Sequence, residues 1–207
     1  MSMNLSESKT KENLMKAFAG ESQARNRYTL GAEKARQMKM YSIADIFEYT
    51  AEQERAHAER YYELLKSLSG ETIFIDGGYP VDQQEDLAQL IRAAEHNEKE
   101  EADDVYQEFA RVAKEEGFLE AASAFSLIAE VERTHQLRFA QVAEMLEKNE
   151  YFASENTGKW ICTNCGYIFE GKQAPSSCPS CHHEQGYFLP SNHLISSVIM
   201  YSLVMIS

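Results

Sequence analysis

The stretch Phe125-Ser-Leu-Ile-Ala-Glu-Val-Glu132-Arg-Thr-His135 decides the fold, because a closely related stretch lies 78 residues before it. The earlier copy is Phe47-Glu-Tyr-Thr-Ala-Glu-Gln-Glu54-Arg-Ala-His57, and both copies contain the motif Glu-x-x-His. Further identical pairs keep the same offset: Tyr28 with Tyr106, Ala32 with Ala110, Ala35 with Ala113, and Ala51 with Ala129. The repeat predicts two helical hairpins built on one plan.

Each motif interrupts an apolar helical stripe. Residues at steps of three and four on both sides of Glu132 and His135 are apolar, and the same holds around Glu54 and His57. An ionised glutamate is rarely buried without a partner, because its desolvation is costly. A Glu–His hydrogen bond within each helix would satisfy one copy. Two copies in register favour a cation between the helices.

Three more glutamates fall into inward-facing rows of two other helices. The first helix is expected over residues 9–37, and Glu21 lies in its apolar row. The third helix is expected to open at Asp82, with a glutamate three residues later as in a capping box. Among the nearby glutamates of this helix, Glu98 and Glu101 continue the inward row.

The repeat also places the break between the first two helices. Neither Gly nor Pro marks it, but Lys39 corresponds to Gly117, a suitable terminator between the last two helices. The second helix is expected over about 42–68. The long connection 69–81 can then supply the crossover between the two hairpins.

Five carboxylates and two imidazoles thus converge on one core. They are Glu21, Glu54, His57, Glu98, Glu101, Glu132 and His135. One Glu from each of two helices plus Glu-x-x-His from each of the other two is typical of ferritin-like di-iron or di-manganese bundles. Tyr28 and Tyr106 are either hydrogen-bond donors to these ligands or ordinary core tyrosines. We expect a mainly α fold, with a ferritin-like four-helix bundle over residues 1–149.

A second module follows an expected linker at 150–158. Within 159–189, Cys162-x-x-Cys165 and Cys178-x-x-Cys181 form two knuckles that predict a tetrahedral four-thiolate metal site. So small a segment needs metal in order to fold. Thiolates alone do not separate iron from zinc. Beside a redox di-metal bundle, a one-electron iron centre makes more functional sense.

Composition narrows the classes of partner. The net charge of −13 argues against binding to nucleic acid or to an anionic membrane surface. The N-terminus has no apolar signal core, and two close Cys pairs suit metal ligation in a reducing cytoplasm. The tail 190–207 is apolar from Leu194 to Ile206. It is shorter than the roughly 20 residues that a membrane helix requires, and its role stays open.

The motifs and their order resemble the rubrerythrin family over about residues 10–189. The resemblance lies in Phe18-Ala-Gly-Glu21-Ser-x-Ala24, the two Glu-x-x-His motifs, Glu98-x-x-Glu101 ahead of Tyr106, Cys162-x-x-Cys165-Gly-Tyr and Ala174-Pro-x-x-Cys178-Pro-x-Cys181. It implies a bundle with two Fe ions, oxo- or hydroxo-bridged when oxidised, and a rubredoxin-like domain with one Fe. It also implies a peroxidase that reduces hydrogen peroxide to water in oxidative stress protection.

The same resemblance implies the roles of individual residues. Glu54 and Glu132 would bridge the two irons, and Glu21 and Glu98 would be terminal ligands. His135 would hold one iron. The other iron would exchange Glu101, when oxidised, for His57, when reduced. Rubredoxin, an NAD(P)H-dependent reductase or both would donate electrons to a homodimer, which in some members of the family exchanges helices between its subunits.

Two other functions stay open on sequence grounds. A ferroxidase or iron-storage protein would keep the bundle, but it would leave the cysteine module without a clear task. A non-catalytic binding module would carry zinc in the cysteine ribbon and structural metal in the bundle. The identity of the metals and the response to peroxide separate these functions from the peroxidase.

Overall fold

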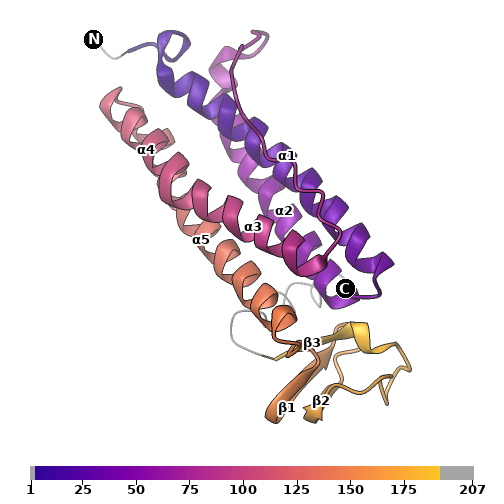
Figure 1. Cartoon of the computed structure of the whole chain (residues 1–207). Helices are drawn as coiled ribbons and strands as arrows, with labels where there is room; N and C mark the ends of the chain where they lie inside the picture. Colours follow the sequence, from indigo (N-terminus) through magenta and orange to yellow (C-terminus); the bar gives the residue numbers. More distant parts are fainter. Residues whose placement is uncertain (1–2, 192–207) are drawn as a thin grey trace. The chain divides into compact units, whose positions relative to one another are not determined.

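The computed structural model describes residues 3–191 and confirms a mainly helical fold (Figure 1). The helices are α1 (Lys9–Gln37), α2 (Tyr41–Leu64), α3 (Leu87–Glu100), α4 (Tyr106–Glu115) and α5 (Leu119–Glu147), with a π-helical segment η3 (Glu101–Val105) and short 3-10 turns η1 (Leu5–Glu7), η2 (Lys66–Leu68) and η4 (Gln185–Tyr187). The strands are β1 (Ala153–Cys162), β2 (Ile168–Gln173) and β3 (Phe188–Pro190). Most of the apolar tail lies outside the described residues.

The two hairpin turns end their first helices in the same way. Lys39 and Gly117 both have positive φ, at 59° and 88°. The backbone N–H of Met40 donates to Ala35 at 2.9 Å, and that of Phe118 donates to Ala113 at 2.8 Å. These are the six-residue bonds of Schellman motifs, and each residue of one turn lies 78 positions from its counterpart in the other. The break predicted at Lys39 is therefore confirmed, although a lysine occupies the left-handed position.

The chain forms two compact units, each of which contains a part of every long helix. The first unit comprises residues 1–27, 51–83 and 93–136. Its apolar core combines residues of α1, α2, α4 and α5, including Leu14, Tyr61 and Phe125. The ring of Tyr61 lies 5.1 Å from that of Phe125 and 5.6 Å from that of Tyr106, measured between centroids. This aromatic packing adjoins the glutamates of the inward rows.

The start predicted for the third helix is wrong. Helix α3 begins at Leu87 rather than Asp82, and the side chain of Asp86 accepts the N–H of Gln89 at 2.9 Å in the manner of an N-cap. Asp82 instead accepts bonds from Arg27 of α1 at 3.0 Å and from Asn97 of α3 at 2.7 Å. Its carboxylate therefore holds the end of the crossover against two helices.

The sequence predicts one continuous third helix, but the structure interrupts it. Residues 101–105 form the π-helical segment η3 between α3 and α4. Glu98 and Tyr106 are eight residues apart, whereas Glu21 and Tyr28 are seven apart. A π-helical turn accommodates one additional residue, so both ends of the helix keep their inward faces. The segment explains why the repeat pairs Glu21 with a lysine rather than with Glu98.

The second unit comprises residues 28–50, 84–92 and the chain from 137 onward. Its three-stranded antiparallel sheet has the order β2-β1-β3, and Trp160 pairs with both Phe169 and Pro190. Strand β1 begins at Ala153, within the stretch 150–158 that we expected to be a linker. The small core of the ribbon contains the side chains of Trp160, Cys162, Ala174, Cys178 and Phe188.

The start of α2 contacts the ribbon within this unit. Ser42 Oγ donates to the carbonyl of Phe188 and lies 3.0 Å from Tyr151 Oη. Trp160 Nε1 donates to the carbonyl of Tyr151 at 3.1 Å. The two contacts of Ser42 connect α2 to Tyr151 and to strand β3.

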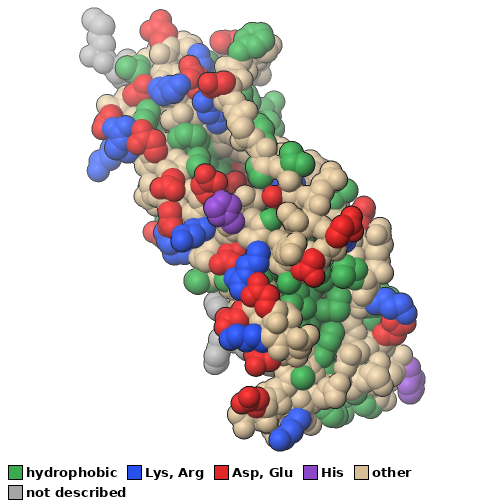
Figure 2. Space-filling view, in the orientation of Figure 1, with side chains coloured by type: hydrophobic (Ala, Val, Ile, Leu, Met, Phe, Trp, Pro, Cys, Tyr) green, Lys and Arg blue, Asp and Glu red, His purple; other side chains and the backbone are tan. Residues whose placement is uncertain are grey.

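The described residues contain no helix that is both long enough and apolar enough to span a membrane. Figure 2 shows acidic and basic side chains interspersed over the visible face rather than gathered into a single basic patch. Exposed ion pairs of the described residues include Arg92 with Glu147 and Arg111 with Glu108.

A side chain at Gly186 is expected to disrupt the contact between the ribbon and the first hairpin turn. An ideal Cβ at Gly186 would lie 1.7 Å from the carbonyl oxygen of Lys39, which is backbone and cannot turn away. Gly186→Ala should lower the free energy of unfolding by ~2 kcal/mol, a typical cost of overpacking. Chemical denaturation would measure this loss. Gly78→Ala is the matched control, because its Cβ meets nothing within 4 Å, and equal stability of the two variants would contradict the prediction.

Candidate metal centre

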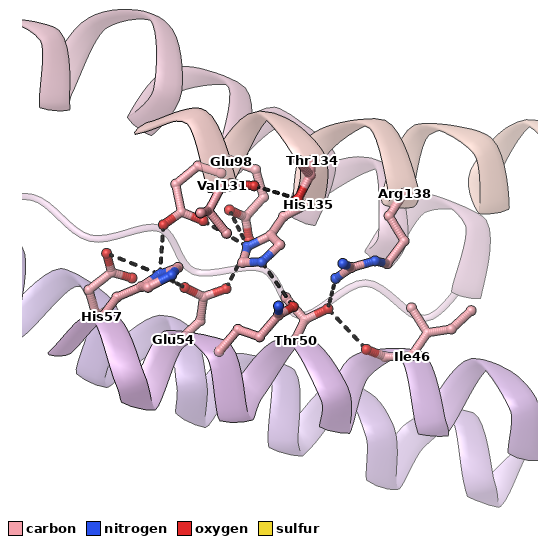
Figure 3. Close-up of polar contacts among 12 residues, drawn as sticks. Ile46, Thr50, Glu54, His57, Glu98, Val131, Thr134, His135 and Arg138 are labelled. Atoms are coloured by element: carbon pink, nitrogen blue, oxygen red, sulfur yellow. Dashed lines mark hydrogen bonds and ion pairs between the residues drawn. The ribbon is translucent and has the colours of Figure 1, made fainter. Parts of the chain in front are cut away.

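Six of the seven predicted ligands come together inside the first unit. Two groups of ligand atoms form, each with its atoms within 4.8 Å of one another. One group contains Glu21, Glu54, His57 and Glu132, and the other contains Glu54, Glu98, Glu132 and His135. The two glutamates of the Glu-x-x-His motifs belong to both groups. The arrangement therefore provides two adjacent sites with two shared carboxylates (Figure 3).

In both groups the imidazole presents Nδ1 to the carboxylates. His57 Nδ1 lies 2.8 Å from Glu132 Oε1, 3.1 Å from Glu54 Oε2 and 3.9 Å from Glu21 Oε1. His135 Nδ1 lies 2.7 Å from Glu132 Oε2, 3.0 Å from Glu54 Oε1 and 3.5 Å from Glu98 Oε2. Each shared glutamate thus directs one oxygen to each imidazole, as expected of a carboxylate that bridges two ions.

The donor set fits a pair of metal ions. Glu21, Glu54, Glu132 and His135 are at most 1% exposed. Glu21 Oε2 and both carboxylate oxygens of Glu132 have no hydrogen-bond partner among the described residues, although the imidazoles lie close. Buried oxygens of this kind are costly unless a cation or a proton satisfies them. Carboxylate oxygens and imidazole nitrogens suit iron or manganese.

Without metal, the close carboxylates perturb one another strongly. Burial, followed by the charge of Glu54, raises the pKa of Glu98 to about 8. Burial and the neighbouring carboxylates also raise the pKa of Glu21 well above its usual range. Burial opposes the charged form of His57, but Glu132 outweighs it and raises the pKa of His57 to about 10. The metal-free site therefore retains protons that a metal must displace.

The stability of the metal-free chain is expected to fall as the pH rises. Glu98 and His57 have higher pKa values in the folded chain than their ordinary values of 4.5 and 6.5. Their contribution is complete at low pH and is lost as the pH rises through about 8 and about 10. Denaturant titrations of metal-free protein should show that the free energy of unfolding falls by a few kcal/mol, as an order of magnitude, between pH 4.5 and about pH 10. The Glu98→Gln variant should have a shallower slope, and a slope equal to that of wild type would contradict the assignment.

Glu101 lies outside both groups. It is the first residue of η3 and is partly exposed, whereas the other six predicted ligands of the bundle are buried. Burial and the charge of Glu98 raise the pKa of its carboxyl group.

The two predicted tyrosines have different surroundings. Tyr106 Oη donates a short hydrogen bond to Glu21 Oε1. The ring of Tyr28 packs against that of Phe139, with 5.2 Å between the ring centroids.

Sequence reasoning did not identify Gln53, which contacts the second histidine. His135 Nε2 lies 3.1 Å from Gln53 Oε1, so a proton on Nε2 leaves the Nδ1 lone pair directed at the shared carboxylates. Gln53 is adjacent to Glu54 but lies off the apolar stripe. The 78-residue repeat pairs it with Val131, whose side chain cannot hydrogen-bond. The glutamine that contacts His135 therefore has no hydrogen-bonding equivalent in the other half of the repeat.

The four cysteines form a second group in the ribbon. Their sulfur atoms lie within 4.8 Å of one another, with 3.7 Å between Cys162 and Cys181 and between Cys165 and Cys178. All four thiols are free of disulfides. Cys162 and Cys178 are buried, whereas Cys165 is exposed. The group has the size and composition of a tetrahedral thiolate site.

Each cysteine knuckle has a residue with positive φ directly after its second cysteine. Gly166 has φ 76° and His182 has φ 61°. Their N–H groups donate to the backbone carbonyl oxygens of Cys162 at 2.8 Å and of Cys178 at 2.9 Å. A hydrogen bond from the backbone of His183 lowers the pKa of Cys181 to about 6, which favours the thiolate that binds metal.

Fold and sites together define a class: a helical bundle with a carboxylate- and histidine-rich dinuclear site, joined to a four-cysteine ribbon. The rubrerythrin family model matches residues 12–151, and the model of the rubrerythrin rubredoxin-like domain matches residues 160–189. This chain belongs to the rubrerythrin family. Its bundle ligands and its four cysteines fit the di-iron pair and the rubredoxin-like iron site of that family.

Relatives and solved structures agree with this assignment. The chain is 45% identical over 186 residues to a rubrerythrin of Clostridium perfringens, covering 89% of this chain and 95% of the relative. It is 40% identical to a rubrerythrin of Nitratidesulfovibrio vulgaris, with the same coverage. The structure resembles mixed-valence nigerythrin at 28% identity, with a TM-score of 0.59 and coverage of 89% of this chain and 90% of that one. A Desulfovibrio desulfuricans bacterioferritin matches at 26% identity and TM-score 0.62, over 69% of this chain and 82% of that one. The prediction of a ferritin-like bundle with a rubredoxin-like ribbon is confirmed.

Proposed function

We propose that this protein is a peroxidase that reduces hydrogen peroxide to water in protection against oxidative stress. One peroxide takes up two electrons and two protons and gives two waters. The observation that carries the proposal is the pair of adjacent ligand groups sharing Glu54 and Glu132, in a chain that also holds a four-thiolate site. The bundle supplies a two-electron site, and the ribbon supplies one electron at a time. We divide the chain into a bundle at 1–149, a connection at 150–158, of which residues 153–158 already belong to strand β1, and a ribbon at 159–189.

The residues of the bundle have separate roles in this proposal. Iron held by these residues would supply the electrons for cleavage of the O–O bond. Glu54 and Glu132 hold the two metal positions at a fixed separation, because each directs one oxygen to each group. Glu21 and Glu98 complete one group each. Tyr106 orients Glu21 through its hydroxyl hydrogen bond.

The difference between the histidines supports an exchange of ligands at one metal position. His135 is fully buried and contacts Gln53, whereas His57 is 9% exposed, and the repeat has Val131 at the position equivalent to Gln53. We assign His57 and Glu101 as the two alternatives at that position. The structure has His57 within the group and Glu101 outside it, which is the arrangement that we assign to the reduced protein.

Electron donors and assembly follow from the same proposal. We expect electrons to arrive from rubredoxin, from an NAD(P)H-dependent reductase or from both, through the four-cysteine iron. We also expect a cytoplasmic homodimer, in which the long crossover permits exchange of helices between subunits. Mass measurement of the native protein tests the dimer.

A single turnover under argon tests the function. The anaerobically purified protein is fully reduced and mixed with stoichiometric hydrogen peroxide, and the visible absorption of the iron–thiolate centre is followed. We expect the oxidised colour to return rapidly. If the iron–thiolate centre is coloured before reduction but its colour does not return after peroxide is added, the peroxidase is refuted and ferroxidase chemistry is favoured. A colourless ribbon that contains zinc would refute it in favour of a non-catalytic module.

Glu101→Ala is expected to slow peroxide turnover more than it lowers the iron content. Four carboxylates and two histidines remain to bind metal, but the alternative ligand to His57 is lost. We expect turnover to fall by ~100-fold, with iron content within about twofold of wild type. Stopped-flow kinetics and metal analysis measure the two effects. Asp104→Ala is the control, because Asp104 is exposed in the same π-helical segment and is not a candidate ligand. Loss of iron from Glu101→Ala would contradict the exchange.

A further inference from the structure

Glu101 forms part of the wall of a pocket within the first unit. The pocket has a volume of about 270 Å³. Its lining includes Glu101 of η3, Tyr106 of α4, Gly20 of α1 and Asn97 of α3. The space is several times the roughly 30 Å³ that one water molecule occupies in the liquid. A molecule as small as hydrogen peroxide therefore fits beside a candidate ligand.

The crossover between η2 and α3 forms the outer wall of this pocket, through residues 76–80. Figure 1 shows this part of the chain as an extended trace along α1. Asp76 pairs with Lys16 of α1 at 2.7 Å, and Asp82 contacts Arg27 and Asn97. The crossover is thus held to the helices at both ends of the pocket.

The charges and hydrogen-bonding groups of the pocket lining favour neutral solutes over anions. Glu100 and Glu101 contribute carboxyl groups beyond the pair of Lys16 with Asp76, whose charges cancel. A cleft with this excess of acidic groups disfavours anions. Polar donors and acceptors such as Gln23 and Asn97 can hydrogen-bond to a small neutral molecule. Hydrogen peroxide is neutral at physiological pH and has this hydrogen-bonding character.

We propose that this pocket, between α1, the crossover and η3, is the route by which hydrogen peroxide reaches the buried metal site. The proposal rests on the peroxidase function given above and adds its access path. Six of the seven candidate ligands are buried, and Glu101, the partly exposed one, faces the pocket. Exchange of Glu101 for His57 then takes place at the inner end of the route.

Gly20 provides a direct test, because an added Cβ there meets no atom within 4 Å. Gly20→Phe and Gly20→Leu should fill the pocket from α1, while Gly20→Ala should leave it open. Alanine also suits a helix interior better than glycine. In fully iron-loaded protein, we expect the second-order rate constant for reoxidation by peroxide to fall on the order of 10-fold in Gly20→Phe and less in Gly20→Leu. Gly20→Ala should stay within about twofold of wild type.

A second readout separates this inference from the proposed function. Nitric oxide is a small neutral ligand of ferrous iron, so its binding rate to the reduced bundle should fall in the same order of variants. Unchanged nitric oxide and peroxide rates in Gly20→Phe would overturn the route. If wild type does not react with peroxide, the peroxidase fails, and nitric oxide still tests the pocket. If Gly20→Phe loses iron, Gly20→Leu decides, and unchanged rates in that variant likewise overturn the route.

Discussion

Glu132→Gln is expected to leave the bundle without its iron pair while the four-cysteine iron stays in place. Glu132 belongs to both ligand groups, and its two oxygens lie 2.8 Å from His57 Nδ1 and 2.7 Å from His135 Nδ1. The amide keeps the shape of the side chain but replaces one charged oxygen with an NH₂ group, which cannot bind metal. One metal position therefore loses this ligand and the other keeps only a neutral amide oxygen, so affinity should fall at least ~100-fold. Metal analysis together with the visible spectrum measures the two sites separately.

Glu130→Gln is the matched control for this variant. Glu130 lies two residues away on α5 and is exposed, so its substitution removes the same charge from the same helix without touching the site. It should retain all its iron and its peroxide turnover. Full iron occupancy of the bundle in Glu132→Gln would show that the shared carboxylate is not required and would overturn the bridging role.

Cys178→Ser is expected to abolish turnover supported by an external electron donor. Cys178 is fully buried in the ribbon core and contributes one of the four sulfur ligands. Serine oxygen is a poor ligand for a site built from soft thiolates, so the ribbon should lose its iron, its colour and much of its order. Steady-state reduction of peroxide with rubredoxin or reductase should fall by ~100-fold or more, because no one-electron centre remains to feed the bundle.

The bundle of the Cys178→Ser variant should still react once. Chemically reduced protein has its two electrons in place, so a single addition of peroxide should oxidise the di-iron pair at a rate close to that of wild type. Ser180→Ala, an exposed position in the same knuckle, is the control for handling and folding. Undiminished steady-state turnover in Cys178→Ser would show that electrons reach the bundle without the ribbon.

Much of the site follows from spacing alone. The two Glu-x-x-His motifs sit in apolar stripes, and a stripe fixes which side chains point inward once the helix forms. The structure brings these four residues together with Glu21 and Glu98. The cysteine knuckles are equally direct, because four thiols at this spacing have few alternatives to a shared metal. The roles of individual ligands stay predictions, since they depend on chemistry that spacing does not encode.

The remaining features depend on contacts between distant residues. The start of α3 was misplaced because Asp82 and Asp86 are both plausible caps, and only the contacts of Asp82 with Arg27 and Asn97 remove it from that role. Gln53 escaped notice because it lies off the stripe and reaches His135 from another helix. The left-handed Lys39 was found only through its counterpart Gly117, since lysine carries no turn signal of its own.

The π-helical segment η3 interrupts the internal symmetry of the bundle. The single extra residue between Glu98 and Tyr106 is absorbed in the π-helical turn, so the helix keeps its contacts at either end. Glu101 has no acidic counterpart in the first half, because the aligned positions there are Gln23 and Ala24. The pseudo-twofold symmetry of the bundle therefore ends at the point where the seventh ligand candidate lies.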